Sequence, residues 1–159
     1  MSKLQVFLVG GTHGNEINAP WLLEAWDKTP NDNIVNTSGI NVFREIGNPS
    51  ALQASKRYID IDLNRSFTSE LLSQFNSELI EVKRAQELVN IYGPKGSSPC
   101  QIAIDLHSTT SCMGSCLVIY GRRQADLALA SLFQARLWLP IYLHEGDNSQ
   151  QGFFVESWP

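Results

Sequence analysis

The sequence contains few cysteines, no excess of positive charge and no long hydrophobic run. Its three cysteines (Cys100, Cys112 and Cys116) are an odd number without disulfide-framework spacing, which indicates a reducing compartment. With 12 basic and 16 acidic residues, the chain lacks the basic face that a general nucleic-acid or membrane-surface binder needs. The first apolar run stops at Gly10, too short for a signal peptide or a membrane-spanning helix. These absences predict a cytoplasmic protein that binds neither nucleic acid nor membrane.

The 159 residues, of which 43% are hydrophobic, are enough for one domain with a sizeable core. Apolar strand patterns alternate with helical patterns along the chain. Strands are predicted at residues 6–9, 40–44, 102–107, 117–120 and 141–144, and helices at 18–28, 69–92 and 125–137. Asn18 is expected to cap the first helix. This alternation predicts an α/β layer fold, in which ligands gather beyond the carboxyl ends of the strands.

The chain is organised around residues 10–16, which read Gly-Gly-Thr-His-Gly-Asn-Glu. They follow the first predicted strand, and the glycines allow a sharp turn there. Imidazole and carboxylate are good ligands for a borderline cation such as Zn²⁺, so His13 and Glu16 are predicted to be two metal ligands. The alternative is a phosphate cradle at the start of the following helix. The stretch matches neither common phosphate-loop pattern, and Glu16 would repel a phosphate.

A third ligand is predicted at His107, the last residue of the strand expected at 102–107. Both histidines can then reach the same edge of one sheet. Asp105 points to the same face of this strand as His107 and is placed to orient the histidine. Three protein ligands and an open position are typical of catalytic zinc. The alternative is a core histidine beside an ordinary carboxylate.

A rival metal site would combine His107 with Cys112 and Cys116. These cysteines lack the two-residue spacing of a zinc knuckle, and no fourth partner is evident. Buried free thiols are the simpler interpretation of the pair.

A third polar stretch, residues 57–65, reads Arg-Tyr-Ile-Asp-Ile-Asp-Leu-Asn-Arg. Arg57 and Arg65, with Asn64 beside the second, are a candidate carboxylate clamp, because guanidinium offers a rigid donor fork. An arginine near a metal can also stabilise the oxyanion of a tetrahedral intermediate. The alternative is a surface loop whose arginine–aspartate pairs contribute little to stability.

Three motifs, in this order, closely resemble the aspartoacylase and succinylglutamate desuccinylase family: residues 10–16, residues 57–65, and the Asp-Leu-His-Ser-Thr-Thr of residues 105–110. Residues 81–87 and 93–95 add likeness to the aspartoacylase branch. The resemblance covers nearly the whole chain. It implies a zinc-carboxypeptidase-like α/β fold with a mixed, mostly parallel sheet flanked by helices.

The resemblance also implies the roles of six residues. One Zn²⁺ per chain would be bound by three ligands: His13, Glu16 and His107. Arg57 would polarise the scissile amide carbonyl, while Asn64 and Arg65 would hold a substrate carboxylate. The implied reaction is deacylation of a small anionic N-acyl amino acid, with N-acetylaspartate the type substrate and N-succinylglutamate the alternative. The sequence does not decide the oligomeric state, and a homo-oligomer is one of the alternatives.

One family feature is not recognisable in the sequence. The family's general base is a glutamate in a Gly-x-x-Ile-Glu-x-Gly-Pro-like segment, which a β-rich domain follows. Glu156 is not followed by Gly-Pro, and residues 155–159 resemble the stretch just upstream of the base. The sequence therefore predicts that residues 1–159 are a zinc-hydrolase catalytic domain truncated at its C-terminal end, without the β-rich domain. The alternative function is a catalytically incomplete, zinc-dependent binding module for acyl amino acids.

Overall fold

The computed structural model describes residues 3–29, 39–93 and 100–144. The chain divides into two compact units. The first contains the described residues up to Thr109, and the second contains those from Thr110 to His144. Within the described residues, no helix is both long enough and apolar enough to cross a membrane.

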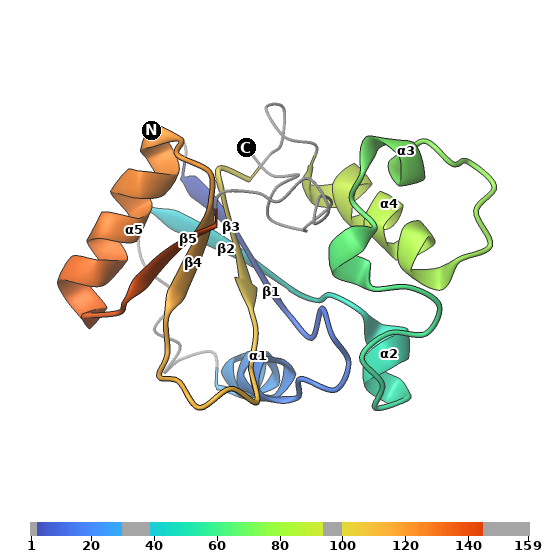
Figure 1. Cartoon of the computed structure of the whole chain (residues 1–159), viewed down its shortest axis with the longest axis horizontal. Helices are drawn as coiled ribbons and strands as arrows, with labels where there is room; N and C mark the ends of the chain where they lie inside the picture. Colours follow the sequence, from blue (N-terminus) through green and yellow to red (C-terminus); the bar gives the residue numbers. More distant parts are fainter. Residues whose placement is uncertain (1–2, 30–38, 94–99, 145–159) are drawn as a thin grey trace. The chain divides into compact units, whose positions relative to one another are not determined.

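The first unit is built on a parallel sheet with the strand order β2-β1-β3 (Figure 1). The strands are β1 (Leu4–Gly10), β2 (Ile40–Ile46) and β3 (Ile102–Leu106). All three predicted strands are present, and β3 ends one residue before His107. Gly10 pairs with Ile46 on one side and with Leu106 on the other. The carboxyl ends of the three strands therefore lie in one row.

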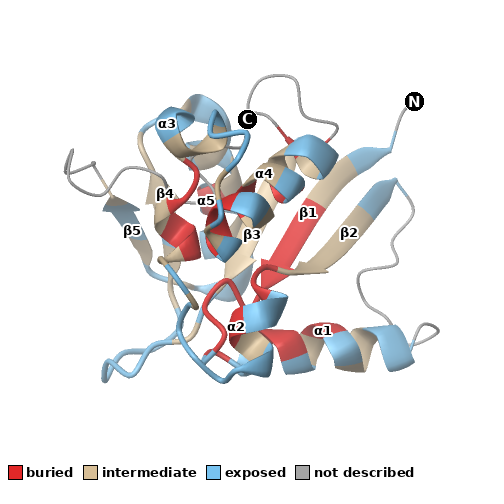
Figure 2. Ribbon diagram, turned by 90° about the vertical axis from the view of Figure 1, so that its right-hand side faces the viewer, coloured by how far each residue is buried: buried red, intermediate tan, exposed pale blue. Residues whose placement is uncertain are grey.

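Helices cover both faces of this sheet, as Figure 2 shows. One face of β1 presents Phe7 and Val9 to α4 (Ile80–Tyr92), with which they share the main core cluster. The other face presents Leu8 and Gly10 to α1 (Asn18–Lys28). A Cβ on Gly10 would come 2.8 Å from the Cβ of Ala19, so the glycine lets α1 approach the strand closely. The predicted α/β layers are confirmed.

Phe7 is at the centre of the core. Its side chain is fully buried, and its ring stacks on that of Tyr92 with the centroids 4.0 Å apart. The rest of the cluster comes from α4 itself and from the segments before and after it: Leu63, Phe67, Ala85, Leu88 and Cys100. The core therefore ties the loop before α4 and the start of β3 to the central strand.

Three short helices lie between β2 and α4, namely α2 (Pro49–Gln53), η1 (Leu63–Arg65) and α3 (Ser69–Leu72). Each begins after a side chain that accepts a hydrogen bond from a backbone N–H of the first turn. These caps are Asn48, Asp62 and Thr68. Because every helix here is short, the capped backbone rather than apolar periodicity sets the course of the chain.

The predicted continuous helix over residues 69–92 is wrong between α3 and α4. The side chain of Ser77 accepts a hydrogen bond from the N–H of Leu79, and Asp60 caps α4 by accepting from the N–H of Ile80. These polar groups compete with helical hydrogen bonds, and the second of them is a tertiary contact. Phe75, which fitted the helical spacing, is almost completely exposed.

The expected capping role of Asn18 is also wrong. Asn18 is the first residue of α1, and Ile17 precedes it without a capping side-chain hydrogen bond. The predicted limits of this helix, residues 18 and 28, agree with the structure.

The second unit is a strand–helix–strand segment. It consists of β4 (Leu117–Tyr120), α5 (Gln124–Leu137) and β5 (Ile141–His144), and the two strands pair in parallel. All three elements were predicted. The helix has only a weak apolar face, because Ala130 is buried whereas Leu132 and Leu137 are exposed. Every strand pair in the described part of the chain is parallel.

The core assignment predicts very different effects for two phenylalanines. Phe7→Ala would remove a fully buried ring and leave a cavity, so we expect the free energy of unfolding to fall by about 3–5 kcal/mol. Phe75 is 96% exposed, and Phe75→Ala should change stability by no more than about 0.5 kcal/mol. Urea unfolding of the two variants beside the parent measures both effects. Equal effects would contradict the assignment.

Candidate functional site

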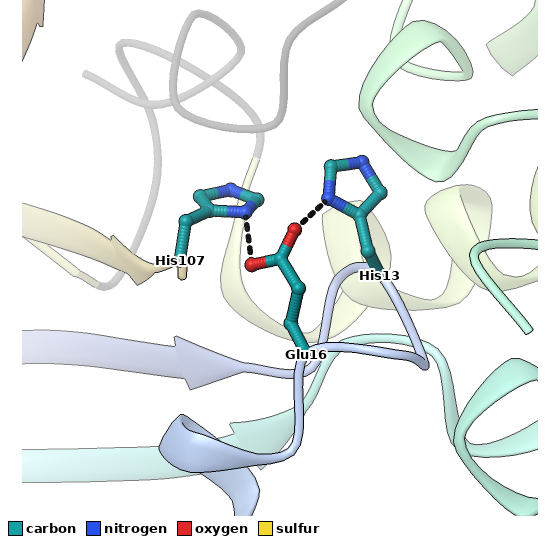
Figure 3. A group of neighbouring side chains, drawn as sticks. All are labelled: His13, Glu16 and His107. Atoms are coloured by element: carbon teal, nitrogen blue, oxygen red, sulfur yellow. Dashed lines mark hydrogen bonds and ion pairs between the residues drawn. The ribbon is translucent and has the colours of Figure 1, made fainter. Parts of the chain in front are cut away.

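Three side chains that could bind a metal converge at the carboxyl edge of the sheet (Figure 3). One ligand atom from each of His13, Glu16 and His107 lies within 4.8 Å of the others. Among the described residues, no other group of three or more His, Cys, Asp or Glu side chains meets in this way. The strand register explains the convergence: His13 and Glu16 follow β1, His107 follows β3, and the last residues of the two strands are paired.

Glu16 lies between the two histidines. Its Oε1 is 2.6 Å from Nδ1 of His13, and its Oε2 is 3.1 Å from Nδ1 of His107. The backbone N–H of Ser108 donates to Oε2 at 2.6 Å. Only 5% of His13 and 9% of Glu16 are exposed to solvent, whereas the side chain of His107 is one-third exposed. The cluster is thus buried on the β1 side and open on the β3 side.

The outer nitrogen of each imidazole faces an aspartate. Nε2 of His13 is 3.1 Å from Oδ1 of Asp62, and Nε2 of His107 is 2.8 Å from Oδ2 of Asp105. Thr12 in turn donates its hydroxyl hydrogen to Oδ1 of Asp105 at 2.8 Å. The predicted contact between Asp105 and His107 is therefore present. If Nε2 carries the proton in each ring, both Nδ1 lone pairs point toward Glu16.

Electrostatics in the cluster favour positive charge near the histidines. Burial alone would lower the pKa of His107, but its contacts with Asp105 and Glu16 raise that pKa to about 10. Burial also acts to lower the pKa of His13, but the hydrogen bonds with Asp62 and Glu16 outweigh it, so this pKa is raised as well. Burial opposes ionisation of Glu16 and Asp62 as well, yet their histidine contacts hold both carboxyl pKa values well below the usual range.

This donor set fits a divalent cation. A lone-pair nitrogen 2.6 Å from a carboxylate oxygen would be repulsive unless positive charge lies between them. A proton on each ring can supply that charge, and so can a metal ion that takes the two Nδ1 atoms and Glu16 as ligands. Two imidazoles and one carboxylate form a ligand set used by catalytic zinc. The aspartates at Nε2 complete the usual arrangement of hydrogen bonds around metal-bound histidines.

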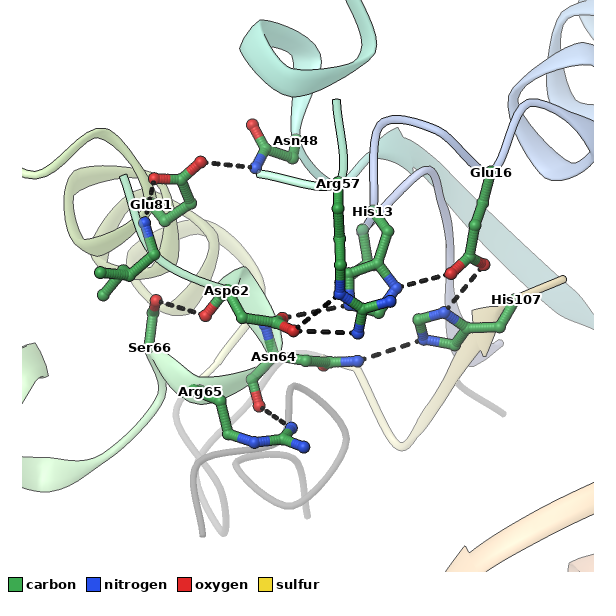
Figure 4. Close-up of polar contacts among 12 residues, drawn as sticks. His13, Glu16, Asn48, Arg57, Asp62, Asn64, Arg65, Ser66, Glu81 and His107 are labelled. Atoms are coloured by element: carbon green, nitrogen blue, oxygen red, sulfur yellow. Dashed lines mark hydrogen bonds and ion pairs between the residues drawn. The ribbon is translucent and has the colours of Figure 1, made fainter. Parts of the chain in front are cut away.

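Arg57 and Asn64 lie beside this cluster (Figure 4). Both Nε and Nη2 of Arg57 donate to Oδ2 of Asp62, at 3.2 and 3.0 Å, and the side chain is half exposed. Nδ2 of Asn64 is 3.2 Å from Nε2 of His107. Arg65 donates from Nη1 to the carbonyl oxygen of Asn64 at 2.8 Å. All six predicted site residues therefore belong to the first unit.

The loop that carries His13 packs tightly against the segment that carries Arg57. The N–H of Gly14 donates to the carbonyl oxygen of Arg57 at 3.2 Å. A Cβ on Gly14 would lie 2.0 Å from the carbonyl carbon of Ala51 in α2, so only glycine fits at this position. The close approach brings Arg57 to the carboxyl edge of the sheet.

Sequence analysis missed two charged residues that organise the site. Asp62 joins His13 to Arg57, and the fully buried Glu81 accepts hydrogen bonds from the backbone that precedes Asp62. Helical periodicity could have signalled Glu81, because it shares the buried face of α4 with Ala85 and Leu88. For Asp62, whose partner His13 lies 49 residues earlier in the chain, no comparable pattern exists.

The cysteines do not support the rival metal site. No disulfide joins Cys100, Cys112 or Cys116, and among the described residues no group of three candidate metal ligands includes a cysteine. The interpretation of Cys112 and Cys116 as buried thiols is wrong, because Cys112 is exposed and Cys116 only partly buried. Glu156, which was considered as the general base from the sequence, lies outside the described residues.

Comparison with known proteins agrees with the motifs. The family model described as the succinylglutamate desuccinylase/aspartoacylase catalytic domain matches residues 2–158. Proteins named probable aspartoacylase from Prochlorococcus marinus (strain MIT 9313) and Parasynechococcus marenigrum (strain WH8102) are 62% and 54% identical over all 159 residues. The matched region is 52% of the length of each relative. The chain thus spans about half the length of these curated relatives.

Solved structures extend the likeness to three dimensions. Murine aminoacylase 3 is 33% identical with a TM-score of 0.81, and the match covers 99% of this chain and 53% of the murine protein. The succinylglutamate desuccinylase from Chromobacterium violaceum is 19% identical with a TM-score of 0.69, covering 96% and 50% of the two chains. The latter similarity shows a common fold. Together with the match over residues 2–158, these similarities show that the chain belongs to the succinylglutamate desuccinylase/aspartoacylase family.

Proposed function

We propose that this chain is the catalytic domain of a zinc-dependent amidohydrolase that deacylates an N-acyl amino acid, with N-acetylaspartate as the substrate. Deacylation of acyl amino acids is the chemistry that the family's names describe. The observation that carries the zinc assignment is the convergence of His13, Glu16 and His107 within 4.8 Å. A cytoplasmic location is part of the proposal, supported by the three free cysteines.

In this proposal His13, Glu16 and His107 hold the metal. When bound, Zn²⁺ supplies Lewis-acid chemistry, polarising a carbonyl group and lowering the pKa of water to about 7. Asp62 and Asp105 keep the proton of each histidine on Nε2, which leaves the Nδ1 lone pairs available. On the β1 side, burial of the cluster limits the approach of water. On the β3 side the cluster is open and admits a substrate.

Arg57 is assigned to the scissile carbonyl. Its side chain is half exposed, and Asp62 accepts hydrogen bonds from two of its nitrogens and so holds the guanidinium in place. A pre-positioned cation costs no reorganisation when negative charge develops on the carbonyl oxygen. Nη1 of Arg57 is outside these two hydrogen bonds, so the guanidinium can donate to substrate while it stays bound to Asp62.

Asn64 and Arg65 are assigned to the free carboxylate of the substrate. Their adjacency in η1 and the hydrogen bond from Arg65 to the Asn64 carbonyl hold the two side chains on one short turn. Since the chain carries a net charge of −4, placed arginines rather than overall charge must select an anionic substrate. The leaving amine also needs a proton, and we assign that transfer to a carboxylate other than Glu156, which no Gly-Pro follows.

Two alternatives use the same site. The chain could act as a zinc-dependent module that binds an acyl amino acid without turning it over, or the substrate could be N-succinylglutamate. The succinylglutamate desuccinylase in the family name supports the second alternative. The oligomeric state, a homo-oligomer included, is left to measurement.

Zinc binding gives the first test of the site. The parent chain should bind close to one Zn²⁺, and His13→Ala or His107→Ala should each remove most of it, because two remaining ligands compete poorly with water. His144→Ala is the matched control, since His144 is the third histidine and belongs to the second unit. Elemental analysis after dialysis measures the content. Full occupancy in His107→Ala, or loss on changing Cys112 and Cys116 to serine, would refute the assignment.

Substrate binding tests the carboxylate clamp. Arg65→Lys keeps the positive charge but loses the planar donor fork. At a desolvated site this loss costs on the order of 2 kcal/mol, or about thirtyfold in affinity for N-acetylaspartate. Calorimetric titration of the zinc-loaded protein measures the affinity, and the zinc content should not change. Unchanged affinity in Arg65→Lys would mean that the substrate carboxylate binds elsewhere.

Hydrolysis separates the proposed function from its alternatives. The zinc-loaded chain is given N-acetylaspartate or N-succinylglutamate, with free Zn²⁺ as the blank. We expect N-acetylaspartate to be hydrolysed faster than in the blank. Glu156→Gln should leave that rate unchanged, because the proton transfer is assigned to another carboxylate. A greater rate with N-succinylglutamate would favour desuccinylation, and binding without turnover would favour the binding module.

A further inference from the structure

Glu81, in the first turn of α4, is a fully buried carboxylate outside the candidate metal cluster. Four hydrogen-bond donors surround it, of which Figure 4 labels Asn48. Its Oε1 accepts from the N–H of Ile59 at 2.6 Å and from Nδ2 of Asn48 at 3.0 Å. Its Oε2 accepts from the N–H groups of Asp60 and Ile61 at 3.0 and 3.3 Å. The carboxylate thus binds three consecutive backbone amides, those of residues 59–61. These amides belong to the segment of residues 57–62, called the site loop below, which carries Arg57 and Asp62.

A buried negative charge is costly, so its retention here calls for a physical reason. An ionised carboxylate is tolerated inside a protein when donors replace the water it loses, and hydrogen bonds to a charged group are about twice as strong as neutral ones. Burial would raise the pKa of Glu81, but the donors from Ile59, Asn48 and Asp60 outweigh it and lower the pKa. The charge therefore fixes this backbone more firmly than a neutral side chain could.

The segment that Glu81 fixes, residues 59–61, leads directly into the site. Asp62 follows Ile61, and its carboxylate contacts both Nε2 of His13 and the guanidinium of Arg57. Three residues on from Glu81, Arg84 donates to the carbonyl oxygens of Ile46 and Gly47 at 2.8 and 2.9 Å. Helix α4 consequently binds the site loop through the carboxylate of Glu81, and it binds the carboxyl end of β2 through the guanidinium of Arg84. Both anchors act on backbone atoms, and the anchor at Glu81 fixes the three residues that immediately precede Asp62.

We propose that Glu81 is a positioning residue that sets Asp62, and through it Arg57, against the metal cluster. Glu81 acts on the loop backbone and does not itself touch substrate. The predicted effect on substrate binding rests on the function proposed above, whereas the effect on the Arg57–Asp62 contact does not.

The test compares Glu81→Gln with Glu70→Gln, the same chemical change at an exposed carboxylate in α3. The glutamine amide keeps one acceptor oxygen but places an N–H group against the loop donors, so the loop must shift. In ¹H–¹⁵N spectra of the folded proteins, the Nε–H signal of Arg57 and the amide signals of residues 59–61 should move in Glu81→Gln. The same signals should stay in place in Glu70→Gln.

Affinity for N-acetylaspartate, measured well below the unfolding temperature, should fall about 10–100-fold in Glu81→Gln, the cost of a misplaced positioning group. Zinc content at saturating Zn²⁺ should remain close to one, because the sheet holds Glu16 and His107. Glu70→Gln should match the parent in both measurements. A purely structural role would lower the unfolding temperature but leave the affinity of the folded protein unchanged.

Each outcome separates this inference from the proposed function. An unmoved Arg57 Nε–H signal in folded Glu81→Gln would overturn the inference whatever the substrate. If the parent fails to bind N-acetylaspartate but the signal moves, the positioning role stands and the proposed substrate fails. If Glu81→Gln does not fold, Glu81→Asp decides, because its carboxylate keeps the charge but is one methylene shorter. The Arg57 signal should then shift, and an unshifted signal would again refute the role.

Discussion

The parallel register of β1 with β2 and β3 is the constraint on which the rest of this structure depends. Because Gly10 is level with both Ile46 and Leu106, the segments that leave the three strands start from one row. A shift of β3 by one residue would carry His107 away from Glu16 and turn its side chain to the other face of the sheet. The buried Glu16 carboxylate would then lose a partner that keeps it ionised.

Charge balance explains why so many acidic groups surround two histidines. Three carboxylates, those of Glu16, Asp62 and Asp105, surround two imidazoles and one guanidinium, that of Arg57, so with both rings neutral the cluster has an excess of negative charge. Protons or a divalent cation can offset that excess. Each carboxylate also meets a donor from another part of the chain: Ser108 at Glu16, Thr12 at Asp105, and Arg57 at Asp62. Such a network orients the ring nitrogens while keeping the site open to substrate.

Family membership and site geometry support different levels of the functional argument. The match over residues 2–158 assigns the chain to the succinylglutamate desuccinylase/aspartoacylase family. Fold alone does not select a substrate. In the proposed function, selection depends on three donors, Arg57, Asn64 and Arg65, in the segment whose backbone Glu81 of α4 anchors. Under that proposal, substrate choice depends on the geometry of this segment.

The sequence by itself determined the strands, the limits of α1 and the candidate residues His13, Glu16 and His107, because these follow from local patterns: apolar runs, glycines and strand ends. It misjudged the region between residues 69 and 92, where Asp60 caps α4 from a distance in the chain. It also could not indicate that Glu81 would accept hydrogen bonds from residues 59–61, or that Asp62 would join His13 to Arg57. Only the tertiary structure decided these contacts. A buried charge is stable only beside its donors, and donors far away in sequence leave no periodic trace.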